Sequence, residues 1–170
     1  MPRRSVRSDA HSRNLRLHRL SDTPATFFIT KTLHPKKPVL DEEAREIIVS
    51  AFTFAVQQQR IYLRAFVVMP DHWHALFALR GQWILPKFMH AIMSFVAGKT
   101  FAVLHSHHTS WQDSYYDTRV KTAKQFQFAR YIEQNPVTKG LVEKPEDWKA
   151  SSARRRDLVT DPWPWLLDEQ

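Results

Sequence analysis

Cysteine is absent from the 170 residues of the chain. Its absence excludes disulfide scaffolds, thiolate zinc sites and cysteine nucleophiles, so nitrogen and oxygen atoms would have to hold any metal. Only three glycines are present, and none stands in a Walker-type phosphate-binding loop. No apolar run approaches the roughly 20 residues of a membrane span, and residues 1–20 lack the apolar segment of a signal peptide. We therefore expect a cytoplasmic protein with no membrane partner.

Acidic residues are too few to balance the basic ones. The chain has 25 Lys and Arg against 17 Asp and Glu, a net charge of +8 and a pI near 10.0, which favours a polyanionic partner such as nucleic acid. We expect the basic arm, residues 1–20, to contact DNA phosphates, although a solvated leader would have the same composition. Its arginines are Arg3, Arg4, Arg7, Arg13, Arg16 and Arg19.

The length and the 43% hydrophobic content predict one compact domain at residues 21–152, followed by a C-terminal tail at 153–170. The order of elements is βαββαβ followed by a helix, which predicts an α+β fold: a ferredoxin-like sandwich with an antiparallel sheet. The additional C-terminal helix carries Tyr131 and is free to lie across the sheet. Apolar periodicity predicts strands at 25–33, 62–69, 72–79 and within 111–120, and helices at 41–59, 85–104 and 122–134, the last one stopped by Asn135-Pro136.

Two histidines alternate with Trp73 in the predicted strand 72–79. Side chains of a strand alternate between its faces, so His72 and His74 share one face and Trp73 lies on the other, under the two long helices. Two neighbouring imidazoles can chelate a divalent metal ion. By itself, however, a His-x-His pair in a strand is more often two ordinary polar residues on a half-exposed face.

Tyr131 and Asn135 stand four residues apart, so they lie on one side of the last predicted helix, one turn apart. If that helix covers the histidine face, a phenol and an amide oxygen meet the metal together. The alternative is structural, because a tyrosine on the buried stripe of a helix usually belongs to the core and Asn before Pro usually ends a helix.

The segment Phe66-Val67-Val68-Met69-Pro70-Asp71 followed by His72-Trp73-His74 resembles the histidine-hydrophobic-histidine motif of the HUH endonuclease superfamily. Within it, the chain is similar to the single-tyrosine transposases, above all the REP-associated tyrosine transposases of bacteria. The resemblance covers residues 27–152. Its further motifs are Trp111-Gln112, Tyr115-Tyr116-Asp117, the run 131–137 (YIEQNPV), Gly140-Leu141-Val142, the run 145–148 (PEDW) and Ser151-Ser152.

The resemblance implies that Tyr131 is the nucleophile, that His72 and His74 bind the metal and that Asn135 is a third ligand. The metal would be Mg²⁺ or Mn²⁺, and imidazole ligands favour Mn²⁺. The substrate would be single-stranded or hairpin DNA, cut through a 5′-phosphotyrosine intermediate by a monomer or homodimer. Trp111 is a candidate platform for base stacking.

The chain departs from its relatives in two places. They often carry an Arg where this chain has Asp113-Ser114, and a Lys in the helix after the histidine strand where it has Met93-Ser94. Lys99 is a candidate to compensate as a DNA contact.

Other residues and functions compete with this interpretation. Tyr115 and Tyr116 are rival nucleophiles, although no companion ligand is spaced to accompany them. His105, His107 and His108 resemble a metal cluster but fall in a polar linker. A nonenzymatic or domesticated hairpin-DNA or RNA-binding protein would share the fold, although the RNP aromatic signatures are missing. A zinc deaminase would require Cys-x-x-Cys.

Overall fold

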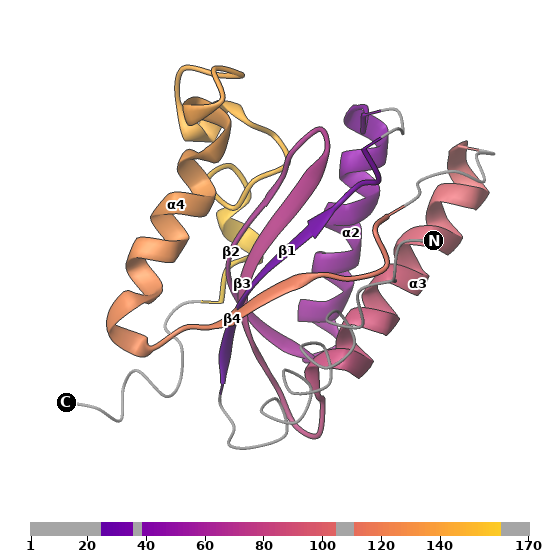
Figure 1. The fold of residues 1–170 in the computed structure, drawn as a ribbon, viewed down its shortest axis with the longest axis vertical. Coiled ribbons are helices and arrows are strands. Elements are labelled where there is room, and N and C mark those ends of the chain that lie inside the picture. The colour runs from indigo at the N-terminus through magenta and orange to yellow at the C-terminus, as the bar shows by residue number, and fades with distance from the viewer. Residues whose placement is uncertain (1–24, 36–38, 105–110, 161–170) are drawn as a thin grey trace, which may run out of the picture.

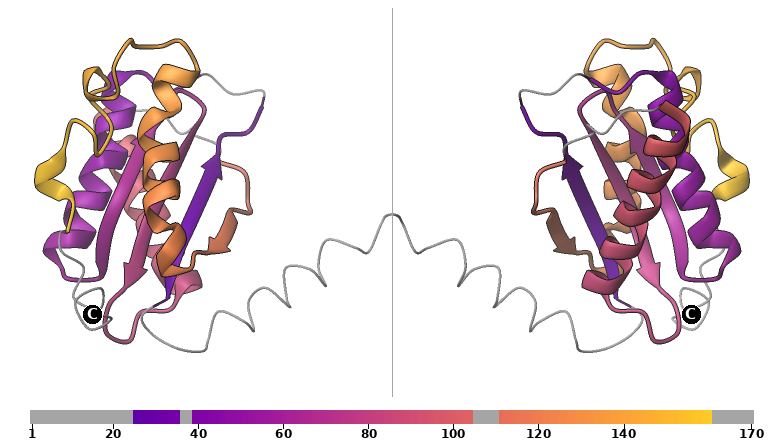
Figure 2. Two further views of the ribbon diagram at one scale, coloured as in Figure 1. Left: turned by 90° about the vertical axis from the view of Figure 1, so that its left-hand side faces the viewer. Right: turned by 90° about the vertical axis from the view of Figure 1, so that its right-hand side faces the viewer.

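The computed structural model describes residues 25–35, 39–104 and 111–160. Its centre is a four-stranded antiparallel sheet of order β2-β3-β1-β4, with helices α2 and α3 on one face and α4 on the other (Figure 1, Figure 2). This order confirms the predicted ferredoxin-like α+β fold. The strands are β1 (Thr26–Thr32), β2 (Ile61–Val68), β3 (His72–Leu79) and β4 (Tyr116–Arg119), and the helices are α2 (Glu42–Gln57), α3 (Leu85–Leu104) and α4 (Gln125–Thr138).

Local chemistry sets the ends of the first elements. The Asp41 carboxylate accepts a hydrogen bond of 2.8 Å from the Ala44 amide and so caps α2. Pro70 and Asp71 form the turn between β2 and β3, which is closed by the Met69 amide donating to the His72 carbonyl at 2.8 Å. His72 is therefore the first residue of β3, directly after the turn.

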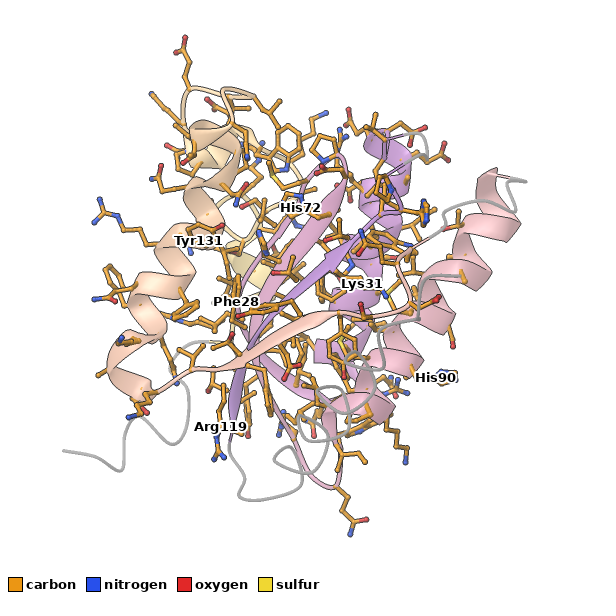
Figure 3. All side chains as sticks on the ribbon, viewed as in Figure 1. Phe28, Lys31, His72, His90, Arg119 and Tyr131 are labelled. Atoms are coloured by element: carbon orange, nitrogen blue, oxygen red, sulfur yellow. The ribbon has the colours of Figure 1, made fainter. Side chains whose placement is uncertain are left out.

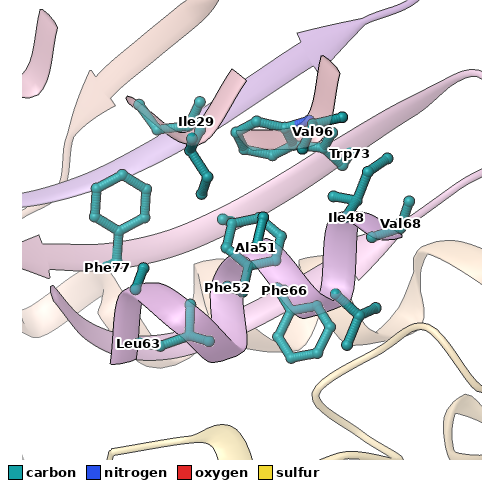
Figure 4. Packing of buried hydrophobic residues seen from close by; sticks show 14 of the residues in the cluster. Ile29, Ile48, Ala51, Phe52, Leu63, Phe66, Val68, Trp73, Phe77 and Val96 are labelled. Carbon is teal, nitrogen blue, oxygen red and sulfur yellow. The ribbon is translucent and has the colours of Figure 1, made fainter. Parts of the chain in front are cut away.

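The main core lies between the sheet and the pair α2 and α3. Phe52 of α2 sits between Phe66 of β2 and Trp73 of β3, with ring centroids 5.4 and 5.3 Å away (Figure 4). Trp73 and Phe77 are fully buried in this cluster, as predicted for that face of β3. Their burial fixes the strand so that its alternate residues, including both histidines, face the opposite side.

The prediction that Asn135-Pro136 stops the last helix is wrong, because α4 continues to Thr138 with Pro136 inside it. Proline costs one intrahelical hydrogen bond, but here it stands in the last turn, and its buried ring packs inward. Gly140, two residues beyond the end of the helix, has φ +67°. The Gly140 amide donates to Val137 and the Leu141 amide donates to Pro136, both at 2.9 Å, which is the Schellman pattern.

The fourth strand is shorter than its predicted window, 111–120. Trp111 makes only an isolated bridge to Leu33, and pairing with β1 begins at Tyr116. Between them, the carbonyls of Gln112 and Ser114 accept hydrogen bonds from the buried ammonium of Lys31. These two carbonyls therefore bind the buried ammonium group and do not take part in strand pairing.

The chain after α4 returns to the outer edge of β2. Ser151 forms a bridge with Val67, and the Val68 amide donates to the Ala150 carbonyl at 2.8 Å. Leu158 then buries its side chain in the main core. Within the described part of the chain, none of the helices has the length and apolar character that crossing a membrane requires.

The end of α4 gives a first prediction. Gly140→Ala should lower the free energy of unfolding by about 1 to 2 kcal/mol, because an L-residue is strained at positive φ. An added Cβ meets nothing within 4 Å, so the loss would come from the backbone alone. Urea unfolding would measure it.

Gly98→Ala is the matched control. Gly98 lies inside α3, where an added Cβ also meets nothing within 4 Å, so alanine should raise stability by about 1 kcal/mol. Equal effects of the two substitutions would contradict the proposed helix ending.

Candidate active site

His72 and His74 lie on the face of β3 that α4 covers, with ring centroids 4.6 Å apart. The Nδ1 atom of His72 lies 2.6 Å from the Asp71 carboxylate, and Nδ1 of His74 lies 2.8 Å from the Thr30 hydroxyl. A ring that donates from Nδ1 keeps Nε2 as the atom with a free lone pair. Each histidine thus has a partner at Nδ1 that orients its ring, and the tautomer with its proton on Nδ1 would leave Nε2 for a ligand.

Burial keeps His74 neutral. Desolvation, with a smaller contribution from the neighbouring His72, lowers the pKa of His74 from 6.5 to about 4. Its imidazole therefore carries no charge at neutral pH, which is the form that binds a metal.

Helix α4 brings Tyr131 to the histidines. Its ring centroid lies 5.7 Å from that of His74 and 6.1 Å from that of Phe28, and Phe28 itself stacks on His74 at 5.2 Å. Figure 3 shows Tyr131 and Phe28 beside each other, between α4 and the sheet. The side chain of Tyr131 is 55% exposed, so its phenol is accessible to a large substrate.

Asn135 lies on α4 one turn beyond Tyr131 and is buried. The helix is antiparallel to β3. Phe128 packs on Phe28, which pairs with Leu76 of β3, and the later helical residue Tyr131 packs beside His74, which is earlier in the strand. Four further helical residues advance about 6 Å and two strand residues about 6.7 Å, which brings Asn135 level with His72.

The Oδ1 atom of Asn135 is buried without a hydrogen-bond partner among the described residues. A buried polar atom without a partner is costly and calls for an explanation. The described residues contain no cluster of three or more His, Asp or Glu side chains suited to a metal. Two imidazoles and an amide oxygen would nevertheless make a nitrogen and oxygen donor set of a kind that suits a divalent ion.

The opposite flank of α4 is tied to the C-terminal segment. Glu133 accepts hydrogen bonds from both terminal nitrogens of Arg156, at 2.7 and 2.9 Å, and from the Ser152 hydroxyl at 2.7 Å. Ser152 in turn exchanges hydrogen bonds with the Phe66 backbone. These bonds fix α4 to the edge of β2 and so help to hold Tyr131 in place.

The structure does not bring together all the predicted site residues. Lys99 is exposed on α3, on the other side of the sheet from the histidines, and Trp111 is half-buried against the main core with its indole nitrogen enclosed. Contacts of either with DNA stay predictions. The arm arginines Arg3, Arg4, Arg7, Arg13, Arg16 and Arg19, and the linker residues His105, His107 and His108, fall outside the described residues.

Two residues that contact the histidines, Asp71 and Thr30, had no predicted role. Asp71 could have been noticed from its place directly before His72. The contact of Thr30 with His74 could not, because it depends on the register of β1 with β3. Tyr116 was considered only as a rival nucleophile, and its place on the histidine face follows from the register of β1 with β4.

Comparisons with known proteins bear on the family and the fold. The model of a family described as "Transposase IS200 like" matches residues 27–135. The fold is similar to that of a REP-associated tyrosine transposase solved with a REP hairpin, with a TM-score of 0.62 and 21% identity over 82% of this chain and 85% of the other. It is also similar to a protein from Deinococcus radiodurans R1 assigned as a transposase, with a TM-score of 0.51 and 24% identity over 66% and 92%. No curated protein matches the sequence.

The lowered pKa of His74 gives a second prediction. The unfolded chain takes up a proton at His74 near pH 6.5, whereas the folded chain takes it up only near pH 4. The unfolded state therefore binds more protons between these values, so the free energy of unfolding should fall by up to about 3 kcal/mol as the pH falls through this window. Urea unfolding with a chelator present would measure the fall.

Carboxylates also titrate in this range, so His74→Gln provides the comparison. Glutamine is polar and does not titrate, and the variant should lose less stability than the wild type on acidification. An identical pH profile for both proteins would show that His74 does not carry this dependence.

Proposed function

Because the chain belongs to the IS200-like transposase family, we propose that it is a metal-dependent endonuclease and strand transferase acting on single-stranded hairpin DNA, with Tyr131 as its nucleophile. The observation that carries the proposal is the exposed phenol of Tyr131 beside the neutral imidazole of His74, with ring centroids 5.7 Å apart. A nucleophile for a macromolecular substrate has to be accessible and close to the group that polarises the scissile phosphate, and a metal held by His74 would supply that group.

His72, His74 and Asn135 would hold the metal, Mg²⁺ or Mn²⁺. The Oδ1 of Asn135, which has no partner among the residues that the structure describes, and the two oriented imidazoles support this assignment. When bound, the ion would polarise the scissile phosphate and neutralise the charge that develops on it.

The proposed reaction has two steps, cleavage and strand transfer. The Tyr131 oxygen attacks the phosphorus, the bond from phosphorus to the 3′-oxygen of the preceding nucleotide breaks, and the phenol proton passes to solvent while the 3′-oxygen gains one. The product is a 5′-phosphotyrosine and a free 3′-hydroxyl. A DNA 3′-hydroxyl then attacks the phosphotyrosine and gives up its proton, while the displaced Tyr131 oxygen regains one. The energy of the phosphodiester is conserved, so no nucleotide cofactor is needed.

Hairpin DNA is the proposed substrate for two reasons. A structural relative was solved bound to a REP hairpin, and the net charge of +8 favours a polyanion. Bases beside a stem are unstacked and accessible, which suits a nucleophile that reaches one phosphate on an open face of a sheet.

The nucleophile is tested with labelled hairpin oligonucleotides that carry single-stranded flanks and are incubated with Mn²⁺. The wild type should form a covalent complex with DNA that survives a denaturing gel. Tyr131→Phe should abolish it, because the attacking oxygen is gone while the ring still packs on Phe28.

Tyr115→Phe and Tyr116→Phe are the matched controls for this test. Both should still form the complex. A complex that persists in Tyr131→Phe and disappears in one of the two controls would move the nucleophile to that residue.

The third ligand has a separate test, Asn135→Leu. Leucine resembles asparagine in shape and has no buried polar atom, so the metal-free variant should be at least as stable as the wild type. The melting temperature of this variant should nevertheless no longer rise with Mn²⁺. The rate at which it forms the covalent complex should fall on the order of 100-fold, as expected for a lost transition-state contact. Normal Mn²⁺ stabilisation of this variant would remove Asn135 from the ligand set.

A further inference from the structure

We infer that Tyr116 forms a base-stacking subsite, which holds an unpaired nucleobase next to the phosphate that Tyr131 attacks. This inference rests on the proposed function, because it gives a specific role in DNA binding to a residue outside the proposed ligands and nucleophile. It is carried by the position of Tyr116 in the sheet and by its exposure.

Strand register puts Tyr116 on the histidine face. Thr30 of β1 pairs with His74 on one side and with Tyr116 on the other. Directly opposed residues of antiparallel strands point to the same face of a sheet. Since the Thr30 hydroxyl contacts Nδ1 of His74 at 2.8 Å, this shared face is the one that carries the proposed metal ligands.

Tyr115 provides an internal check on that orientation. It precedes Tyr116, so its side chain belongs to the other face, and it packs there against the main core. Of the two neighbouring tyrosines, Tyr116 alone is left for a ligand on the histidine side.

Tyr116 stands on the open part of this face. Helix α4 lies over β2 and β3 (Figure 2). On the neighbouring strands, Thr30 of β1 and Thr118 of β4 are half-buried, and Tyr116 of β4 is 67% exposed. Two strand spacings separate β4 from β3, which is about 10 Å. The two exposed tyrosines, Tyr116 on β4 and Tyr131 on α4, thus flank the histidine pair from opposite sides.

Exposure of an aromatic ring to water is unfavourable, and a nucleobase that stacks on the ring covers part of its apolar surface. Nucleobases stack on aromatic side chains with little sequence preference, and each such contact contributes measurably to binding of single strands. A single strand of DNA that passes from Tyr131 over the histidines would reach Tyr116 within one or two nucleotides. We assign Tyr116 to the base of such a flanking nucleotide.

The experiment combines protein and DNA changes in the Tyr131→Phe background, where binding is measured without cleavage. The probe is a fluorescent hairpin with single-stranded flanks, in which one flanking nucleotide at a time is made abasic. Tyr116→Ala should weaken binding on the order of tenfold, as expected for the loss of one stacked base. Tyr116→Phe should restore affinity, because phenylalanine keeps the ring.

The decisive result is non-additivity. One abasic position should weaken binding to the parent protein but cause no further loss in Tyr116→Ala, because the stacking contact is already absent. Phe126→Ala is the control: Phe126 is 68% exposed on the opposite flank of α4, and its variant should remain sensitive to that abasic position.

Additive losses at every flanking position, or unchanged affinity in Tyr116→Ala, would overturn the subsite. A Tyr116→Phe variant as weak as Tyr116→Ala would assign the effect to the hydroxyl and also overturn it. These outcomes differ from a failure of the proposed function, in which the wild type binds no hairpin or Tyr131→Phe still forms the covalent complex.

Discussion

The candidate site depends on one packing contact, the burial of Ile132 of α4 against the histidine face of the sheet. Ile132 is fully buried in a small cluster with Val67 and Leu76. Once this residue points at the sheet, the helical period fixes its neighbours: Tyr131 turns to the flank beside His74 and Asn135 follows one turn later. The main core lies on the other face and does not involve α4. Loss of the small cluster would therefore separate Tyr131, the proposed nucleophile, from the histidines while leaving the histidines in place.

This arrangement meets two opposite demands on burial. His74 and Asn135 are enclosed, which keeps the imidazole neutral and leaves an amide oxygen with no partner in the described part of the chain. Tyr131 is more than half exposed, as access to DNA requires. Both demands are met because the site lies at the boundary of α4, where the covered half of the sheet meets its open half.

Sequence reasoning reached the histidine face and the Tyr131 and Asn135 pair because both follow from short-range geometry: period two in a strand, and four residues in a helix. It failed where tertiary contacts override local preference. Proline is disfavoured inside helices, but α4 contains Pro136, whose ring is buried, and ends only at Thr138, before the turn at Gly140. The face on which Tyr116 lies depends on pairing between distant strands, and a slip of one residue would reverse it.

The segment after α4 contains no predicted site residue, yet it constrains the site. Glu133 lies two residues after Tyr131 and accepts hydrogen bonds from Ser152 and Arg156, and Ser152 is itself bonded to the backbone of Phe66 in β2. An exposed ion pair adds little stability alone, but its bidentate geometry fixes orientation. This attachment adds to the packing of Ile132 and Phe128 on the sheet in resisting rotation of the helix. Arg156 belongs to the stretch that composition alone assigned to the tail, so the position of the proposed nucleophile depends on residues beyond the predicted domain.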